Sequence, residues 1–266
     1  MKYRAIFIDV DGTLLTDKLE ISRATREAIG WIHRMGVLVV IVTARSPGAS
    51  LFLYDELGIS NNPIVCFNGA LIVRENTILH DQQVETSDLK NIVHLLNDFD
   101  INISVYKHHD WFAEKIDKWI EQESAITHSV INRIDFAELL ENEFCANKLL
   151  CMGEPEEIDR AEKYLKHSGF EHLNIHKSKT TYLEITNLNA SKKQGVQKLL
   201  DVYEFNPQQI IAIGDNFNDI DMLQFSGTSV VMGNAPEEVK QVATFVTDTN
   251  NNDGIAKALE RLFGDK

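Results

Sequence analysis

The sequence has few cysteines and no concentration of positive charge. Only Cys66, Cys145 and Cys151 occur among its 266 residues, and their spacing does not fit a metal site. A sparse, odd-numbered set of this kind is typical of buried free thiols in a reducing compartment. The chain has 26 Lys and Arg residues against 40 Asp and Glu residues, which gives a net charge of −14. Because nucleic acids and anionic membranes attract basic surfaces, this charge argues against both as partners.

Long apolar runs are also missing. No uninterrupted run approaches the ~18 residues of a membrane-spanning helix. Asp9 ends the N-terminal apolar run before it could form the core of a signal peptide. We therefore expect a cytoplasmic protein with no membrane partner and no evident obligate protein partner. At 266 residues the chain is longer than one hydrophobic core usually allows, so we expect two domains.

The pattern that organises the chain is a short apolar strand that ends in two carboxylates. Residues 5–8 are all apolar, and a run of this length favours a buried strand. Asp9 and Asp11 follow, on one side of the chain if the extended geometry continues, and Gly12 permits an immediate turn. Ligands of open α/β sheets bind at the carboxyl ends of the strands. Two carboxylates so close together repel each other unless a cation lies between them, and Mg²⁺ suits such oxygen ligands.

Strand and helix patterns alternate near both ends of the chain. Near the N-terminus, a helix predicted over 22–35 with Ser22 as its N-cap separates two strands, and a hairpin is expected to turn at 74–76. The same alternation returns near the C-terminus and includes a short helix with Asn234 as its N-cap. In between, strands alternate with surface-type helices, which is typical of a sheet covered on one side. The sequence therefore predicts an α/β core formed by residues 1–81 and 187–266, with an inserted α+β domain at 82–186.

An isolated acidic pair is more often a solvated turn, but this chain supplies the other parts of a phosphoryl-transfer site. Further apolar strands end at Thr43 and Asp215, and Lys192 stands at a helix start between them in sequence. Phosphoryl transfer needs a nucleophile, a metal and donors to the phosphoryl oxygens, because its catalysis is mostly positioning and charge stabilisation. Asp9 would attack phosphorus, and Asp11 would protonate the leaving oxygen and then activate water. Thr43 and Lys192 would bind the phosphoryl oxygens, and Asp215 would complete the Mg²⁺ site.

These motifs resemble those of the haloacid dehalogenase (HAD) superfamily. The resemblance rests on four segments in the same order: residues 9–13, Thr43, Lys192 and residues 214–219. Residues 234–240, with residues 253–255 after them, resemble the Cof-type phosphatase branch, subfamily IIB. The resemblance implies a Rossmann-like parallel-sheet core and Mg²⁺-dependent hydrolysis of small phosphomonoesters through an aspartyl-phosphate. It also implies that the insertion is a type-2 cap that sets substrate specificity, with sugar phosphates or phosphorylated cofactors as substrates.

The resemblance assigns a role to each matching acidic residue. Asp9 matches the nucleophile, and Asp11 matches the general acid and base. The metal ligands match Asp9, Asp215 and Asp11, the last through its backbone carbonyl. Asp219 matches a residue that orients the lysine or the waters of the metal. Because relatives that keep a lasting aspartyl-phosphate carry Thr in place of the second Asp, Asp11 points to hydrolysis or phosphomutase chemistry.

Two departures from the family pattern affect the phosphate site. The phosphate-binding positions match Thr43, Lys192 and Asn218. Ala44 stands where the branch often has Gly, and both it and Arg45 are candidate substrate contacts, with a surface ion pair as the alternative for Arg45. The third motif commonly reads Lys-Gly, whereas here Lys193 follows Lys192. We favour Lys192 as the phosphate contact, and Lys193 stays an alternative.

Three other functions stay open at this point. A phosphomutase would use the same residues but would keep a persistent phosphoenzyme. A phosphoacceptor signalling protein gathers similar side chains, but its phosphorylated Asp lies on the third strand, where this chain has Asn68. A phosphometabolite-binding sensor without catalysis is disfavoured because every catalytic position is filled.

Several weaker patterns have simple structural explanations. His108, His109 and Asp110 favour a solvated loop over a second metal site. Trp111, Phe112 and Trp119 more often form the core of a domain than a substrate pocket. Asn68 and Gly69, after the third strand, either line the cleft or form a simple turn.

Overall fold

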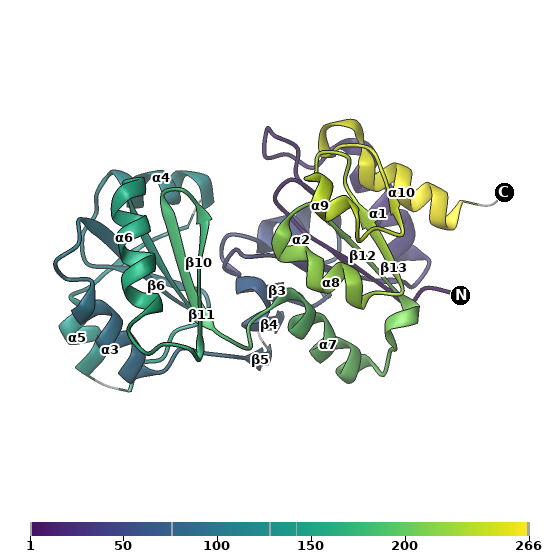
Figure 1. Ribbon diagram of the computed structural model, residues 1–266. Coiled ribbons are helices and arrows are strands. Elements are labelled where there is room, and N and C mark those ends of the chain that lie inside the picture. Colours follow the sequence, from purple (N-terminus) through teal and green to yellow (C-terminus); the bar gives the residue numbers. More distant parts are fainter. Residues whose placement is uncertain (1, 76, 128, 142, 265–266) are drawn as a thin grey trace. The chain divides into compact units, whose positions relative to one another are not determined.

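The computed structural model describes residues 2–75, 77–127, 129–141 and 143–264, which divide into two compact units (Figure 1). The first unit comprises Met1–Ala44, Ser50–His80 and Ser191–Lys266, and the second comprises Arg45–Ala49 and Asp81–Ala190. Asn76, in the predicted hairpin turn, lies outside the described residues. Within the described ranges, no helix has both the length and the apolar composition needed to cross a membrane.

The first unit is built on a mostly parallel sheet. Its eight strands, counted over the described residues, lie in the order β14-β13-β12-β1-β2-β3-β4-β5. Neighbours from β14 to β3 are parallel, whereas β4 is antiparallel to β3. The strands are β1 (Ala5–Ile8), β2 (Leu38–Val42), β3 (Ile64–Cys66), β4 (Leu71–Arg74), β5 (Thr77–Asp81), β12 (Ile210–Gly214), β13 (Thr228–Val231) and β14 (Phe245–Val246). Because β1 lies between β12 and β2, the carboxyl ends of these three strands are adjacent.

Helices bury the apolar strands of the first unit. They are α1 (Arg23–Arg34), α2 (Leu51–Leu57), α7 (Lys192–Tyr203), α8 (Ile220–Phe225), α9 (Glu237–Lys240) and α10 (Gly254–Phe263). Helices α7, α8 and α9 share one apolar core with Phe7 and Val40 of the sheet, and α1 packs against α2 and α10. The Ser22 hydroxyl accepts the Thr25 N–H at 3.2 Å, so the predicted N-cap of α1 is confirmed.

The second unit is an α+β sheet with most of its helices on one face. Its described strands lie in the order β10-β11-β9-β6-β7-β8, and neighbours are antiparallel except for β7 and β8. They are β6 (Ile101–Lys107), β7 (Asp110–Ala113), β8 (Asn132–Arg133), β9 (Lys148–Gly153), β10 (Leu173–Lys179) and β11 (Tyr182–Asn187). The helices are α3 (Thr86–Leu95), α4 (Lys118–Thr127), α5 (Phe136–Glu141) and α6 (Pro155–Lys166). Helices α3, α5 and α6 pack on Leu149 and Leu183, whereas α4 meets the opposite face, where Tyr182 donates to Glu123 at 2.9 Å.

The predicted fold class, an α/β parallel-sheet core with an α+β unit, is confirmed by this topology. The domain boundaries stay a prediction, because a compact unit is not by itself an independently folding domain. Two local predictions are wrong. Pro236, not Asn234, is the N-cap residue of α9. Cys145 is half-buried and donates to Glu85, so it does not belong with the buried thiols Cys66 and Cys151.

Candidate active site

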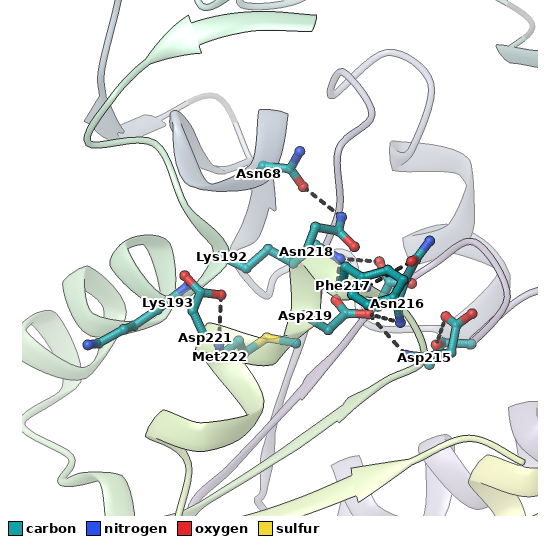
Figure 2. A network of polar contacts seen from close by, with 12 residues as sticks. Asn68, Lys192, Lys193, Asp215, Asn216, Phe217, Asn218, Asp219, Asp221 and Met222 are labelled. Atoms are coloured by element: carbon teal, nitrogen blue, oxygen red, sulfur yellow. Dashed lines mark hydrogen bonds and ion pairs between the residues drawn. The ribbon is translucent and has the colours of Figure 1, made fainter. Parts of the chain in front are cut away.

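Three carboxylates and one lysine are buried together at the carboxyl edge of the first unit's sheet. Asp9 directly follows β1, and Asp215 directly follows the neighbouring strand β12. Asp219 is the last residue of a short 3₁₀ turn, η3 (Phe217–Asp219), and Lys192 is the first residue of α7; Figure 2 shows both with Asp215. Each of the four residues is at most 9% exposed. Because an unpaired charge is expensive to bury, such a cluster depends on its internal contacts.

Lys192 forms ion pairs with two of the three carboxylates. Its Nζ donates to Asp9 Oδ1 and to Asp219 Oδ1, each at 2.5 Å. The Ser191 hydroxyl, which accepts the Gln194 N–H, caps α7 and thereby fixes the backbone from which this side chain extends. Lys193 instead is exposed, and its Nζ lies 5.6 Å from the centre of the Phe225 ring. The structure therefore brings Lys192, and not Lys193, to the carboxylates.

Asp219 holds the turn that presents Asp215. Its Oδ2 accepts the backbone N–H of Asp215 at 3.0 Å and that of Asn216 at 2.9 Å (Figure 2). Its other oxygen, Oδ1, accepts from Lys192. The turn needs Gly214, since a Cβ there would lie 2.6 Å from Asp219 Cγ. Both oxygens of Asp219 are thus already occupied by protein donors.

Asp215 is held by two residues that the sequence did not indicate as its partners. The Thr13 hydroxyl donates to Asp215 Oδ1 at 2.6 Å. Asn234 Nδ2 donates to Asp215 Oδ2 at 3.3 Å and to the Gly12 carbonyl at 2.9 Å. Asn234 was predicted to be the N-cap of a short helix, a position that Asn often occupies. Its amide instead binds Gly12 and Asp215, which are distant in sequence. A Cβ at Gly12 would lie 2.4 Å from Asp215 Oδ2, and its φ of +82° favours glycine.

The electrostatics of the cluster favour a bound cation. Burial, and then the nearby Asp219 carboxylate, raise the pKa of Asp9 well above its usual value, although Lys192 lowers it. Burial also raises the pKa of Asp215 to about 6. Among the described residues, Asp9, Asp215 and Asp219 offer oxygens that all lie within 4.8 Å of one another. Buried carboxylates whose ionised forms are disfavoured in this way fit a hard, oxygen-binding cation such as Mg²⁺.

Asp9 and Asp11 do not share one environment. The extended geometry of β1 ends at Asp9, because the Thr13 and Leu14 N–H groups turn back onto the carbonyls of Val10 and Asp9. As a result Asp9 is buried, whereas Asp11 is exposed in the turn. The side chain of Asp11 is therefore not part of the carboxylate cluster formed by the described residues.

The remaining predicted phosphate contacts lie on neighbouring segments of the first unit. Thr43 directly follows β2, is buried, and donates its backbone N–H to the Val65 carbonyl at 2.8 Å. Asn218 lies in η3, beside Asp219, and its Nδ2 donates to Asn68 Oδ1 at 3.2 Å (Figure 2). Ala44 follows Thr43 and is half-buried.

The second unit contains Arg45 and the weaker candidates His108, Trp111 and Phe112. Arg45 begins the segment Arg45–Ala49, which belongs to the second unit, so the geometry of the first unit does not place Arg45 near Asp9. His108 Nε2 lies 2.7 Å from Asp81 Oδ2, and no metal-type cluster of described residues includes it. Trp111 and Phe112 alternate along β7, so they do not line one pocket. Trp111 stacks on Tyr106, whereas Phe112 packs edge-on against Phe144.

Comparison with known proteins gives a consistent answer over the whole chain. Residues 6–259 match the family of haloacid dehalogenase-like hydrolases. The chain is 38% identical over 266 residues to a Haemophilus influenzae protein with the provisional name of phosphatase, with 99% of each chain covered. It is 30% identical to the Bacillus subtilis 5-amino-6-(5-phospho-D-ribitylamino)uracil phosphatase YitU, with 97% of each covered. It is 27% identical to the Escherichia coli pyridoxal phosphate phosphatase YbhA, again with 97% of each covered.

The fold has an equally complete counterpart. The crystal structure of a haloacid dehalogenase-like hydrolase from Bacteroides thetaiotaomicron superposes with a TM-score of 0.93 at 28% identity. The match covers 98% of this chain and 100% of that one. A parallel sheet with carboxylates and a lysine at its carboxyl edge is an arrangement suited to phosphoryl transfer.

The chain belongs to the haloacid dehalogenase-like hydrolases. It is a phosphatase of the Cof type that hydrolyses phosphoric monoesters, so the predicted family and enzyme class are confirmed.

Proposed function

We propose that this phosphatase is Mg²⁺-dependent, acts on small phosphorylated metabolites and works through an aspartyl-phosphate on Asp9. The setting of Asp9 is the observation that supports the proposal most. A carboxylate nucleophile must be ionised and fixed in orientation. Lys192 contributes to both: its ammonium partly offsets the rise in the pKa of Asp9 that burial causes, and its hydrogen bond holds Oδ1.

In the first step the Asp9 carboxylate attacks the phosphorus of the ester. A bond forms between Asp9 and phosphorus while the bond from phosphorus to the ester oxygen breaks. Asp11 gives its proton to the departing oxygen, which leaves as an alcohol. Thr43, Lys192 and Asn218 bind the phosphoryl oxygens and stabilise the charge that develops on them.

In the second step water releases the phosphate. The ionised Asp11 takes a proton from a water molecule, whose oxygen attacks phosphorus as the bond to Asp9 breaks. Inorganic phosphate leaves, Asp9 is again a carboxylate and Asp11 is again protonated, so the cycle is closed. The exposed position of Asp11 suits a group that must reach both the substrate and water.

Asp9, Asp215 and the backbone carbonyl of Asp11 would hold the metal. Mg²⁺ at this position supplies positive charge beside the phosphoryl group. We do not assign Asp219 as a ligand, although its carboxylate is near, because its Oδ1 is paired with the cationic ammonium of Lys192 and its Oδ2 accepts two backbone N–H groups. The donors to Asp215, Thr13 and Asn234, are neutral. Its role is to hold Lys192 and the turn that carries Asp215.

We further propose that residues 82–186 form a cap domain that selects the substrate. The substrate class is a phosphate ester of a small metabolite, such as a sugar phosphate or a phosphorylated cofactor. Two relatives named for a phosphoribitylamino-uracil and for pyridoxal phosphate support this class.

The test is the release of inorganic phosphate from a panel of sugar and cofactor phosphates, with and without Mg²⁺. We expect Mg²⁺-dependent turnover by the wild type and none by Asp9→Asn, which keeps the shape of the side chain but loses its charge. Asp221→Asn is the matched control, because Asp221 accepts the backbone N–H groups of Lys193 and Met222 and is not part of the carboxylate cluster of the described residues. Turnover by Asp9→Asn, or equal turnover without Mg²⁺, would contradict the proposal.

A further inference from the structure

The turn after β3 has a backbone conformation that L-residues rarely adopt. Strand β3 is followed by η1 (Phe67–Gly69), in which φ is +50° at Phe67, +53° at Asn68 and +101° at Gly69. Asn tolerates this region, but an aromatic residue there is a genuine outlier. Such conformations persist where the surrounding structure determines them, and they concentrate at functional sites.

This turn touches three of the segments that carry the proposed phosphate contacts. The Asn68 N–H donates to the Thr43 carbonyl at 2.9 Å. Asn68 Oδ1 accepts from Asn218 Nδ2 at 3.2 Å (Figure 2). A Cβ at Gly69 would lie 2.1 Å from the carbonyl oxygen of Ser191, the residue before Lys192, so only glycine permits this approach. The left-handed turn therefore places one asparagine between segments that are far apart in the sequence.

We propose that Asn68 is a positioning residue that orients the Asn218 amide toward the phosphoryl group; this inference rests on the proposed function, in which Asn218 binds a phosphoryl oxygen. An amide group is planar, so fixing one N–H of Asn218 fixes the direction of the other. A carbonyl oxygen accepts only from the nitrogen end of an amide. Asn68 Oδ1 thus selects the orientation in which Asn218 keeps an N–H donor, and not its oxygen, for an anion.

The alternative is that the turn only connects β3 to β4. Two substitutions at Asn68 separate the possibilities. Asn68→Ala removes the amide and adds backbone strain, because Ala tolerates a positive φ less well than Asn, whereas Asn68→Gly removes the amide without strain. A role of the backbone alone would leave Asn68→Gly fully active, whereas a role of the amide would impair both variants.

The experiment is a double-mutant cycle between Asn68→Ala and Asn218→Ala. The readouts are kcat/KM, the inhibition constant of inorganic phosphate in the presence of Mg²⁺, and the thermal unfolding midpoint. Glu75→Gly is the matched control, because Glu75 has a φ of +53° in an exposed position outside the site. It relieves the same kind of strain and should leave the kinetic constants unchanged.

We expect Asn68→Ala and Asn68→Gly to lower kcat/KM and to weaken phosphate inhibition, each by about fivefold to tenfold, which is the usual value of one neutral hydrogen bond. In the Asn218→Ala background, Asn68→Ala should have no further effect on either constant. Wild-type kinetics in Asn68→Gly would overturn the inference. So would effects of Asn68→Ala and Asn218→Ala that multiply in the double variant.

The outcome is distinguishable from a failure of the proposed function. If Asp9→Asn is inactive while the Asn68 variants match the wild type, the positioning role fails and the proposed function stands. If Asp9→Asn is active, the proposed nucleophile is wrong. The coupling between Asn68 and Asn218 in phosphate inhibition then still tests the positioning role by itself.

Discussion

Replacing Lys192 with Met should cost far more stability than replacing its neighbour Lys193. The Lys192 ammonium lies 2.5 Å from Asp9 Oδ1 and 2.5 Å from Asp219 Oδ1, and the side chains of Lys192 and Asp219 are fully buried. Met has a similar length but no charge, so both carboxylates would stay buried without their cation. Removing one partner of a buried ion pair costs about 3–5 kcal/mol. For a unit of this size, that loss lowers the unfolding midpoint by on the order of 10 °C.

The assay is denaturant unfolding in the presence of a chelator, so that bound metal does not add stability. Lys193→Met is the matched control: its ammonium is exposed and lies 5.6 Å from the centre of the Phe225 ring. Such a contact contributes only about 0.5–1 kcal/mol. A difference between the two variants of less than ~1 kcal/mol in the free energy of unfolding would refute the reasoning, because removing one partner of a buried ion pair typically costs more than this.

Three further predictions concern other parts of the chain. Gly12→Ala should lower Mg²⁺ affinity, measured by calorimetry, because its Cβ would meet Asp215 Oδ2 at 2.4 Å. Gly36→Ala should leave the affinity unchanged, because Gly36 has a similar φ of +84° but its Cβ would have no atom within 4 Å. Burial raises the pKa of Glu184, but the ammonium of Lys148, 3.5 Å away, and His176 outweigh it and lower the pKa overall. A carboxyl group whose pKa is lower in the folded protein stabilises the fold at pH values above its unfolded-state pKa, which is about 4.3 for Glu. This stabilisation is lost as the pH falls through the folded-state pKa. Lys148→Met should therefore destabilise the protein at neutral pH, and its deficit in unfolding free energy should shrink below about pH 4. Burial raises the pKa of the Cys151 thiol to about 12, so mass spectrometry should find a thiol reagent on half-buried Cys145 first and on Cys151 only after unfolding.

Parts of the fold with strong local patterns could be predicted from the sequence. The apolar run of β1 and the Ser22 cap of α1 carry their signals within a few residues, and both are present. The alternation of strands and helices predicted for 82–186 did not locate the short elements β7, α4, β8 and α5. Short elements are stabilised by packing against the rest of the sheet, so a local period cannot identify them.

In the candidate site too, features that depend on nearby residues could be predicted, whereas contacts between residues distant in sequence could not. Asp9, Asp215 and Lys192 each stand at the end of a predictable strand or the start of a predictable helix, and the parallel topology then brings them together. The contacts of Asn234 could not be predicted, because its amide binds Gly12 and Asp215, which are distant in sequence. For the same reason, the sequence alone does not distinguish Asn68 as a cleft residue from Asn68 as part of a simple turn.

The most direct test of the central claim is to trap the phosphoenzyme. An aryl phosphate, whose leaving group needs no proton, is mixed with enzyme and quenched in acid, and the protein is mapped by mass spectrometry. We predict a phosphoryl group on Asp9 that is short-lived in the wild type, accumulates in Asp11→Asn because water is no longer activated, and is absent in Asp9→Asn. Release of the phenol by Asp11→Asn with no phosphoryl group on Asp9, or with the group on another residue, would contradict the account.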